Sequence, residues 1–174
     1  NVDADEKVDP GFGPKGRWKH KLCACCDVII CTPLCCMTYF CNMLVVAQLM
    51  TRLGLDWCGN RNASGAANTF AFVVLLYFAY WAGCVALFGL VLTPVFLCYM
   101  VVIYTRTRYE TRQRFHIQPE YCECCSGAVE DCCLQVLCSC CATIQIARHT
   151  HDEERYPYQF DSPTGLPDYA PPLY

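Results

Sequence analysis

The stretch from Thr69 to Tyr104 contains no Asp, Glu, Lys, Arg or His, although charged residues make up 17% of the chain. An uninterrupted apolar segment of this length is typical of proteins that cross a bilayer. A large soluble protein could bury such a segment, but soluble core helices are usually short and the rest of this chain is too small to wrap it. The sequence therefore predicts a small integral membrane protein of the mainly α class, in contact with membrane lipid.

One straight helix over the apolar stretch would be about 54 Å long, whereas the hydrocarbon core of a bilayer is about 30 Å thick. Two arrangements would fit: a helical hairpin that turns between Gly83 and Gly89, or one tilted span with an interfacial extension, broken at Pro94. Positive residues flank the stretch on both sides, at Arg52, Arg61, Arg106, Arg108, Arg112 and Arg114. Because arginine favours the cytoplasmic side, we expect the hairpin, with both termini in the cytoplasm.

The remainder of the chain divides by composition into three parts. Residues 1–17 form a polar extended arm, residues 18–149 form a cysteine-rich domain that contains the membrane segment 69–104, and residues 150–174 form a Pro-rich extended tail. Within the domain we expect a helix from Asn42 to Leu53 that ends at Gly54, a loop to Asn68, and an Arg/Tyr/Thr connector up to Pro119. The net charge of −3 argues against a nucleic-acid partner.

The chain has 18 cysteines, gathered mainly into one cluster on each side of the apolar stretch. Disulfides, metal thiolates and S-acylation are all compatible with this density, and each implies a different compartment. Zinc prefers four converging thiolate or imidazole ligands, and pairs spaced three positions apart place two sulfurs on one helical turn. We therefore predict a structural zinc site formed by Cys122, Cys125, Cys138 and Cys141.

Three histidines, His116, His149 and His151, could also bind a metal, but we interpret them as solvated side chains of charged linkers. The two cysteine clusters could be copies of each other. One helical face would carry Cys41, Gln48 and Arg52, and another would carry Cys138, Cys141, Gln145 and Arg148. Coincidence in a cysteine-rich chain is the alternative explanation.

The sequence contains no recognisable catalytic arrangement of Ser, His and Asp, of Cys and His, or of paired carboxylates, and it has no Gly-rich phosphate loop. We therefore expect that the protein is not an enzyme. The tail ends in Pro171-Pro172-Leu-Tyr174, the pattern that WW domains bind in polyproline II form. We expect the tail to lie along another polypeptide, a WW-domain protein among the candidates, with Tyr169 and Tyr174 as aromatic anchors. The alternative is that the tail folds back over the cysteine clusters of its own chain.

Three motifs resemble those of the cysteine-rich placenta-specific-gene-eight family, which includes plant cadmium-resistance proteins and cell-number regulators. The first runs from Trp18 to Cys25, and the second is the Arg-x-Arg-aromatic connector at Arg112. The third is Asp131 followed by Cys138-Ser-Cys140-Cys141, Gln145 and Arg148. The resemblance covers roughly residues 18 to 149.

The resemblance implies a small, often oligomeric membrane protein with cytoplasmic termini and no enzymatic activity, associated with metal efflux, calcium influx or growth control. Two hypotheses for function remain. The chain is either an oligomeric element in the handling of divalent metals or other cations, or a structural accessory subunit of a larger membrane protein assembly. The apolar hairpin carries no charge that could line an ion path, so a cation route would have to use the cysteine segments.

Overall fold

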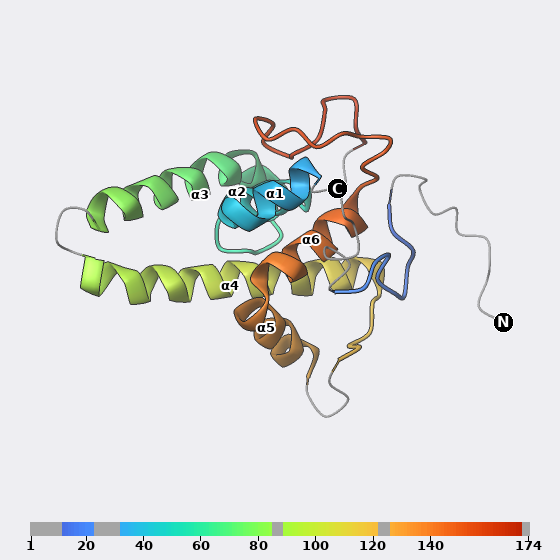
Figure 1. The fold of residues 1–174 in the computed structure, drawn as a ribbon, viewed down its shortest axis with the longest axis horizontal. Coiled ribbons are helices and arrows are strands. Elements are labelled where there is room, and N and C mark those ends of the chain that lie inside the picture. The colour runs from blue at the N-terminus through green and yellow to red at the C-terminus, as the bar shows by residue number, and fades with distance from the viewer. Residues whose placement is uncertain (1–11, 23–31, 85–88, 122–125, 172–174) are drawn as a thin grey trace.

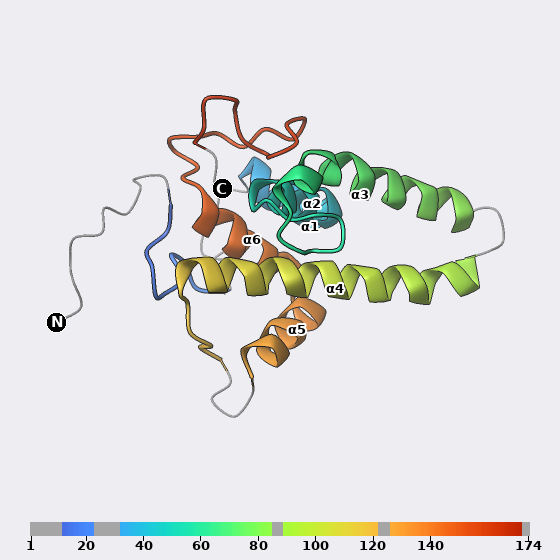
Figure 2. The ribbon, with the colours of Figure 1, turned by 180° about the vertical axis from the view of Figure 1, so that it is seen from behind.

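The computed structural model describes residues 12–22, 32–84, 89–121 and 126–171, and within them the chain is mainly helical, as predicted (Figure 1). The described residues form α1 (Pro33–Phe40), α2 (Asn42–Arg52), α3 (Ala63–Gly83), α4 (Gly89–Phe115), α5 (Gly127–Leu137) and α6 (Ser139–Thr150). Helices α3 and α4 project together from one end of the molecule, and the other four helices form a bundle around the opposite half of α4 (Figure 2). This arrangement separates a two-helix apolar hairpin from a four-helix bundle that contains most of the buried hydrophobic core.

The hairpin consists of α3 and α4, which are both long and apolar enough to cross a membrane. Asn62 caps the start of α3 by accepting a hydrogen bond from the backbone N–H of Gly65 at 3.2 Å. The helix therefore begins at Ala63, inside the expected loop. Aromatic contacts hold the two helices together, among them the stacked rings of Tyr80 and Phe96, whose centroids are 4.1 Å apart.

Helix α4 is longer than the sequence suggested, because the expected Arg/Tyr/Thr connector is helical as far as Phe115. Pro94 lies inside this helix, so it does not break the span. Two of the four connector arginines are not part of a solvated flank: Arg108 is 0% exposed and Arg112 is 4% exposed. They enter the bundle, where acidic side chains meet them.

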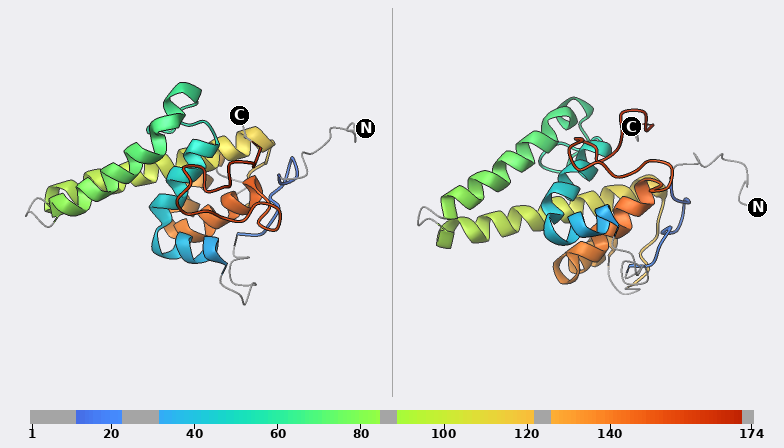
Figure 3. Two further views of the ribbon diagram at one scale, coloured as in Figure 1. Left: turned by 90° about the horizontal axis from the view of Figure 1, so that it is seen from above. Right: turned by 45° about the horizontal axis from the view of Figure 1, so that its top comes forward.

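Each of the other two helix pairs forms a sharp bend, which we call an elbow. Elbow 1 joins α1 to α2 with a bend of 113° at Cys41, and elbow 2 joins α5 to α6 with a bend of 117° at Cys138. Helix α2 ends as expected, because Gly54 adopts φ 71° and its N–H binds the carbonyl of Thr51. Seen from above, both elbows face the end from which the hairpin projects (Figure 3).

Buried charges attach elbow 2 to α4. The carboxylate of Asp131 on α5 accepts a hydrogen bond from Arg108 Nε at 3.1 Å and lies 3.4 Å from Arg112 Nε. Arg108 also donates to the side-chain oxygen of Gln145 on α6 at 2.8 Å, and its guanidinium lies 4.5 Å from the ring centroid of Trp18. One arginine of α4 thus contacts α5, α6 and the N-terminal arm.

Two glutamines fasten the non-helical ends of the chain to the bundle. Gln145 donates to the backbone carbonyl of His20 in the arm at 2.9 Å. Gln48 donates to the carbonyls of Phe160 and Ser162 in the tail, each at 2.9 Å. Arg52 strengthens the second attachment by donating to the Thr164 carbonyl at 2.7 Å. The described part of the tail therefore packs against its own chain.

Replacing Arg108 with Met should lower the free energy of unfolding by about 3–5 kcal/mol, because the buried carboxylate of Asp131 would lose an ion-pair partner. Chemical denaturation of the purified chain in detergent would measure the change. Arg61→Met is the matched control, since Arg61 pairs with Glu110 of α4, the helix that carries Arg108, but its side chain is 65% exposed. Its loss should cost less than about 1 kcal/mol. Equal effects of the two substitutions would contradict the structural role of Arg108.

Candidate metal centre at the second elbow

The sulfur atoms of Cys138, Cys140 and Cys141 lie within 4.8 Å of one another at elbow 2. The bend creates this cluster. Cys138 ends α5 in a non-helical conformation, with φ −146° and ψ 61°, and α6 begins at the next residue. Cys140 and Cys141 then lie in the first turn of α6, where they face back toward Cys138. Among the described residues this is the one group of three metal-ligating side chains that meets this geometry.

The spacing of the thiols fits a thiophilic metal ion. Zinc–thiolate bonds are about 2.3 Å long, so two sulfurs at the corners of a zinc tetrahedron are about 3.8 Å apart. The Sγ atoms of Cys140 and Cys141 are 4.0 Å apart. Cys141 is buried and the other two are half-buried, so the cluster is shielded on one side and open on the other. These three thiolates, the ones that the described part of the chain supplies, would bind a soft divalent ion such as zinc or cadmium.

The structure brings together two of the four predicted zinc ligands, Cys138 and Cys141. The other two, Cys122 and Cys125, lie outside the described residues. Cys140 was not among the predicted ligands, because residues i and i+2 of a continuous helix point in different directions. The elbow removes that restriction by taking Cys138 out of the helix.

The two elbows repeat the same pattern of residues at a constant offset. Cys35, Cys36, Cys41 and Gln48 of elbow 1 each have a counterpart 97 positions later, at Cys132, Cys133, Cys138 and Gln145 of elbow 2. The bends are of nearly equal angle, and each glutamine anchors one end of the chain. These agreements support the hypothesis of an internal duplication, with the hairpin inserted between the copies. Arg52 departs from the pattern, since its counterpart at this offset is His149.

The prediction that His116, His149 and His151 are solvated was wrong for two of the three. His116 is exposed, but His149 is 0% and His151 is 1% exposed. The ring of His149 packs edge-on against Phe115 and Trp18, with centroids 4.4 and 5.2 Å away, and its Nδ1 accepts the backbone N–H of Lys19 at 3.1 Å. These contacts make His149 a packing residue beneath the arm.

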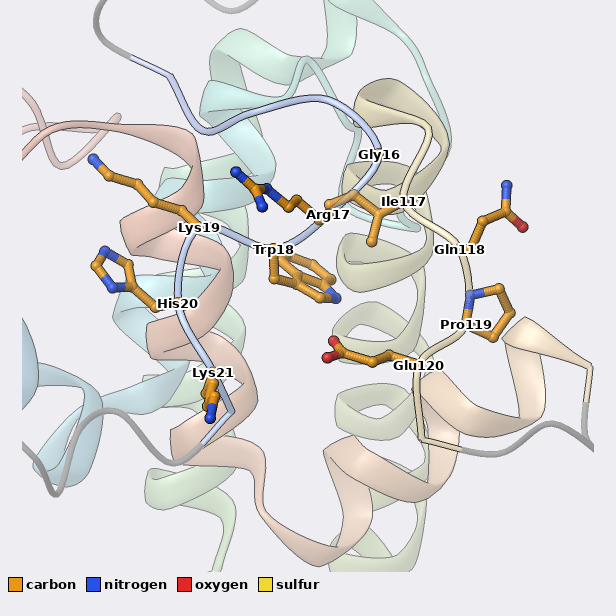
Figure 4. A pocket seen from close by; sticks show the side chains of 10 residues that line it. All are labelled: Gly16, Arg17, Trp18, Lys19, His20, Lys21, Ile117, Gln118, Pro119 and Glu120. Carbon is orange, nitrogen blue, oxygen red and sulfur yellow. The ribbon is translucent and has the colours of Figure 1, made fainter.

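The arm crosses the end of α4 and forms one wall of an open pocket lined by residues 16–21 and 117–120. Figure 4 shows Trp18 beneath the arm, with Lys19 and Lys21 directed away from it. Glu120 lies on the opposite wall. Within the described residues it belongs to no group of three candidate metal ligands. The arm side of the pocket is therefore basic, Trp18 forms an aromatic floor, the opposite wall carries the acidic Glu120, and no cysteine is among the lining residues.

The residues predicted to bind a partner lie in the last part of the tail. Tyr169 is 70% exposed, and its ring contacts Tyr156 at 6.0 Å. Pro171 ends the described segment, and Pro172 and Tyr174 lie outside it. The WW-domain hypothesis therefore stays a prediction.

The site belongs to a helical protein that combines two helices of membrane-crossing length with a thiol cluster. The sequence model of the PLAC8 family matches residues 18–149, which include the arm from Trp18, both elbows and the hairpin. The chain belongs to the PLAC8 family, as its motifs indicated. No curated protein and no solved structure matches the chain at a significant level.

The two buried histidines should make the protein less stable in acid. Burial lowers the pKa of His149 to about 4 and that of His151 to about 3, from an ordinary value of 6.5. The unfolded chain then binds protons first, so stability should be lost as the pH falls from about 6.5 toward 4. Burial raises the pKa of Asp131 to about 6, so this group alone would make the folded state more stable as the pH falls. The two histidines have the opposite effect on stability and outnumber it.

Denaturation in detergent at pH values between 4.5 and 6.5 would measure this slope. His151→Gln should reduce it by about 1.4 kcal/mol per pH unit, the value for one proton. His116→Asn, at an exposed position, is the control and should leave the slope unchanged. A slope that is insensitive to His151→Gln would contradict the assignment.

Proposed function

We propose that this chain is a non-enzymatic integral membrane protein that binds a soft divalent cation on the thiolates of Cys138, Cys140 and Cys141, as an oligomeric element in divalent-metal handling. The observation that carries the proposal is the convergence of these three sulfurs within 4.8 Å at a bend beside a membrane-length helix. Membership in the PLAC8 family supports the assignment as a cysteine-rich family protein but does not identify the ion.

The described residues supply three ligands, and a three-ligand site favours reversible handling of the ion over permanent storage. Structural zinc sites are closed by four protein ligands, whereas a site with an open position can accept or release a ligand. The half-buried Cys138 and Cys140 leave the cluster accessible from one side. A fourth thiolate would close the site and convert it into a structural staple, which is the form that the sequence predicted.

We further propose that α3 and α4 span the bilayer as a hairpin and that the bundle lies in the cytoplasm. The hairpin is apolar along the part that projects from the bundle, and the first charged residue along α4 is Arg106. Arg61 and Arg114 lie at the same end of the hairpin, where they line one shallow pocket. An arginine just before α3 and another near the end of α4 favour cytoplasmic placement of that end of the hairpin, together with the arm and the tail.

Metal binding by the full-length chain in detergent tests the proposal. Elemental analysis after exposure to zinc or cadmium should find about one tightly held ion per chain, as expected for thiolate sites. Replacing Cys138, Cys140 and Cys141 together with Ser should abolish binding. Cys84→Ser is the control, because Cys84 lies at the end of α3 that is far from the bundle and the elbow.

Two outcomes would overturn the metal proposal: less than about half an ion per chain in the parent protein, or full retention by the triple variant. A chain that binds no ion but co-purifies in fixed ratio with another membrane protein would support the accessory-subunit hypothesis instead. The outward faces of α3 and α4 would suit such packing, since Leu75, Phe78, Trp81 and Leu97 are all more than half exposed.

A further inference from the structure

Both elbows expose large apolar side chains directly before the bend. Tyr39 and Phe40, which precede Cys41, are 74% and 77% exposed. Val136 and Leu137, which precede Cys138, are 61% and 83% exposed. These pairs are counterparts at the same 97-residue offset as the cysteines. Two copies of one motif thus present the same kind of surface, which indicates a shared purpose for the exposed residues.

The contacts of elbow 2 fix its position along α4. Helix α5 runs antiparallel to α4, since Gly127 lies beside Arg112 and Asp131 beside Arg108. Helix α6 then returns parallel to α4, since Gln145 contacts Arg108 and His149 contacts Phe115. Both directions place the bend on the apolar side of Arg108. Gln145 lies seven positions after Cys138, which corresponds to a helical rise of about 10 Å.

Elbow 1 points the same way. The end of α2 lies against the end of α6, because Arg52 donates to the hydroxyl of Thr150 at 3.0 Å. The start of α2, and with it the bend at Cys41, therefore lies toward the hairpin. Figures 1 and 3 show both elbows turned toward the end from which α3 and α4 project.

An aromatic group marks the level at which the hairpin leaves the bundle. The hydroxyl of Tyr99 donates to the backbone carbonyl of Trp57 at 2.9 Å, and the rings of Trp57 and Phe72 are 5.0 Å apart. Trp57 is 47% exposed. Tryptophan and tyrosine gather at membrane–water interfaces, where their amphipathic rings are favoured. Tyr99 lies nine positions before Arg108 on α4, so this belt and elbow 2 occupy the same region of the helix.

The backbone at each bend can tolerate an apolar environment. The N–H of Cys41 donates to the carbonyl of Met37, and the N–H of Cys138 donates to the carbonyl of Leu134. The carbonyls of Cys41 and Cys138 accept the N–H groups of Leu44 and Ala142. Each bend therefore changes the direction of the chain without leaving these polar groups unpaired, which is the condition for entering lipid.

We propose that the two elbow tips, with Tyr39 and Phe40 on one and Val136 and Leu137 on the other, insert into the headgroup–acyl boundary of the cytoplasmic leaflet. The proposal rests on the proposed membrane insertion of the hairpin and extends it to residues outside the two spans. The elbows flank the hairpin as shallow wedges, and elbow 2 brings the cluster of Cys138, Cys140 and Cys141 to the lipid boundary.

The test uses the full-length chain, with all its cysteines, in lipid vesicles. An environment-sensitive fluorescent amino acid replaces one residue at a time: Phe40 or Leu137 at the elbows, Leu97 in the hairpin, or Tyr169 in the tail. All four positions are exposed, so the substitutions leave the core intact. Quenching is measured with lipids that carry a nitroxide near the top of the acyl chain and, separately, with iodide in the water.

At positions 40 and 137, quenching by the nitroxide lipids should come within about twofold of that at position 97, and iodide quenching should be weak, as for interfacial residues. Position 169 should show the reverse. If positions 40 and 137 behave like 169 while 97 responds to lipid, the elbow proposal fails and the hairpin stands. If position 97 also responds only to iodide, the proposed membrane insertion fails as well. Protection from both quenchers at 40 and 137 would mean that protein, such as a second copy, covers the elbows, and would also overturn the proposal.

Discussion

Arg108 is fully buried in the half of α4 that enters the bundle, and its charge has to be balanced there. Asp131 supplies the opposite charge, Gln145 an additional acceptor, and Trp18 an aromatic face. A buried charge without such partners would cost several kcal/mol, so α5, α6 and the arm are constrained to positions around this residue. Burial raises the pKa of Asp131 and the neighbouring arginines lower it; burial has the larger effect, and the pKa is raised to about 6, which still leaves the carboxylate mostly ionised at neutral pH.

The constraint at Arg108 has a chemical consequence at the elbow. With Asp131 of α5 and Gln145 of α6 both held against one side chain of α4, the residues between them must reverse direction. The reversal occurs at Cys138 and brings its sulfur to those of Cys140 and Cys141. Elbow 1 has a similar bend, and its Cys35, Cys36 and Cys41 have the same spacing as the corresponding cysteines of elbow 2. Its glutamine binds the tail instead of the arm.

Short-range features of the sequence predicted the parts of the fold that are set by neighbouring residues. Lack of charge predicted the hairpin, and Gly54 predicted the end of α2. The extension of α4 was missed, because Arg108 and Arg112 look like a solvated flank until Asp131 and Glu130 are placed beside them. The burial of His149 and His151 was missed for the same reason, since their partners lie far away in the sequence. Cys140 was missed because its role depends on a bend, which helical periodicity cannot show.

The central claim is that packing around Arg108 assembles a three-thiolate site at the second elbow. X-ray absorption spectroscopy of the zinc-loaded, full-length chain tests it most directly, because the spectrum counts sulfur neighbours. The account predicts at least three sulfurs at about 2.3 Å from the metal, and fewer in a chain that carries Arg108→Met. A first shell made of oxygen and nitrogen alone, or a sulfur count that the Arg108 substitution leaves unchanged, would contradict it.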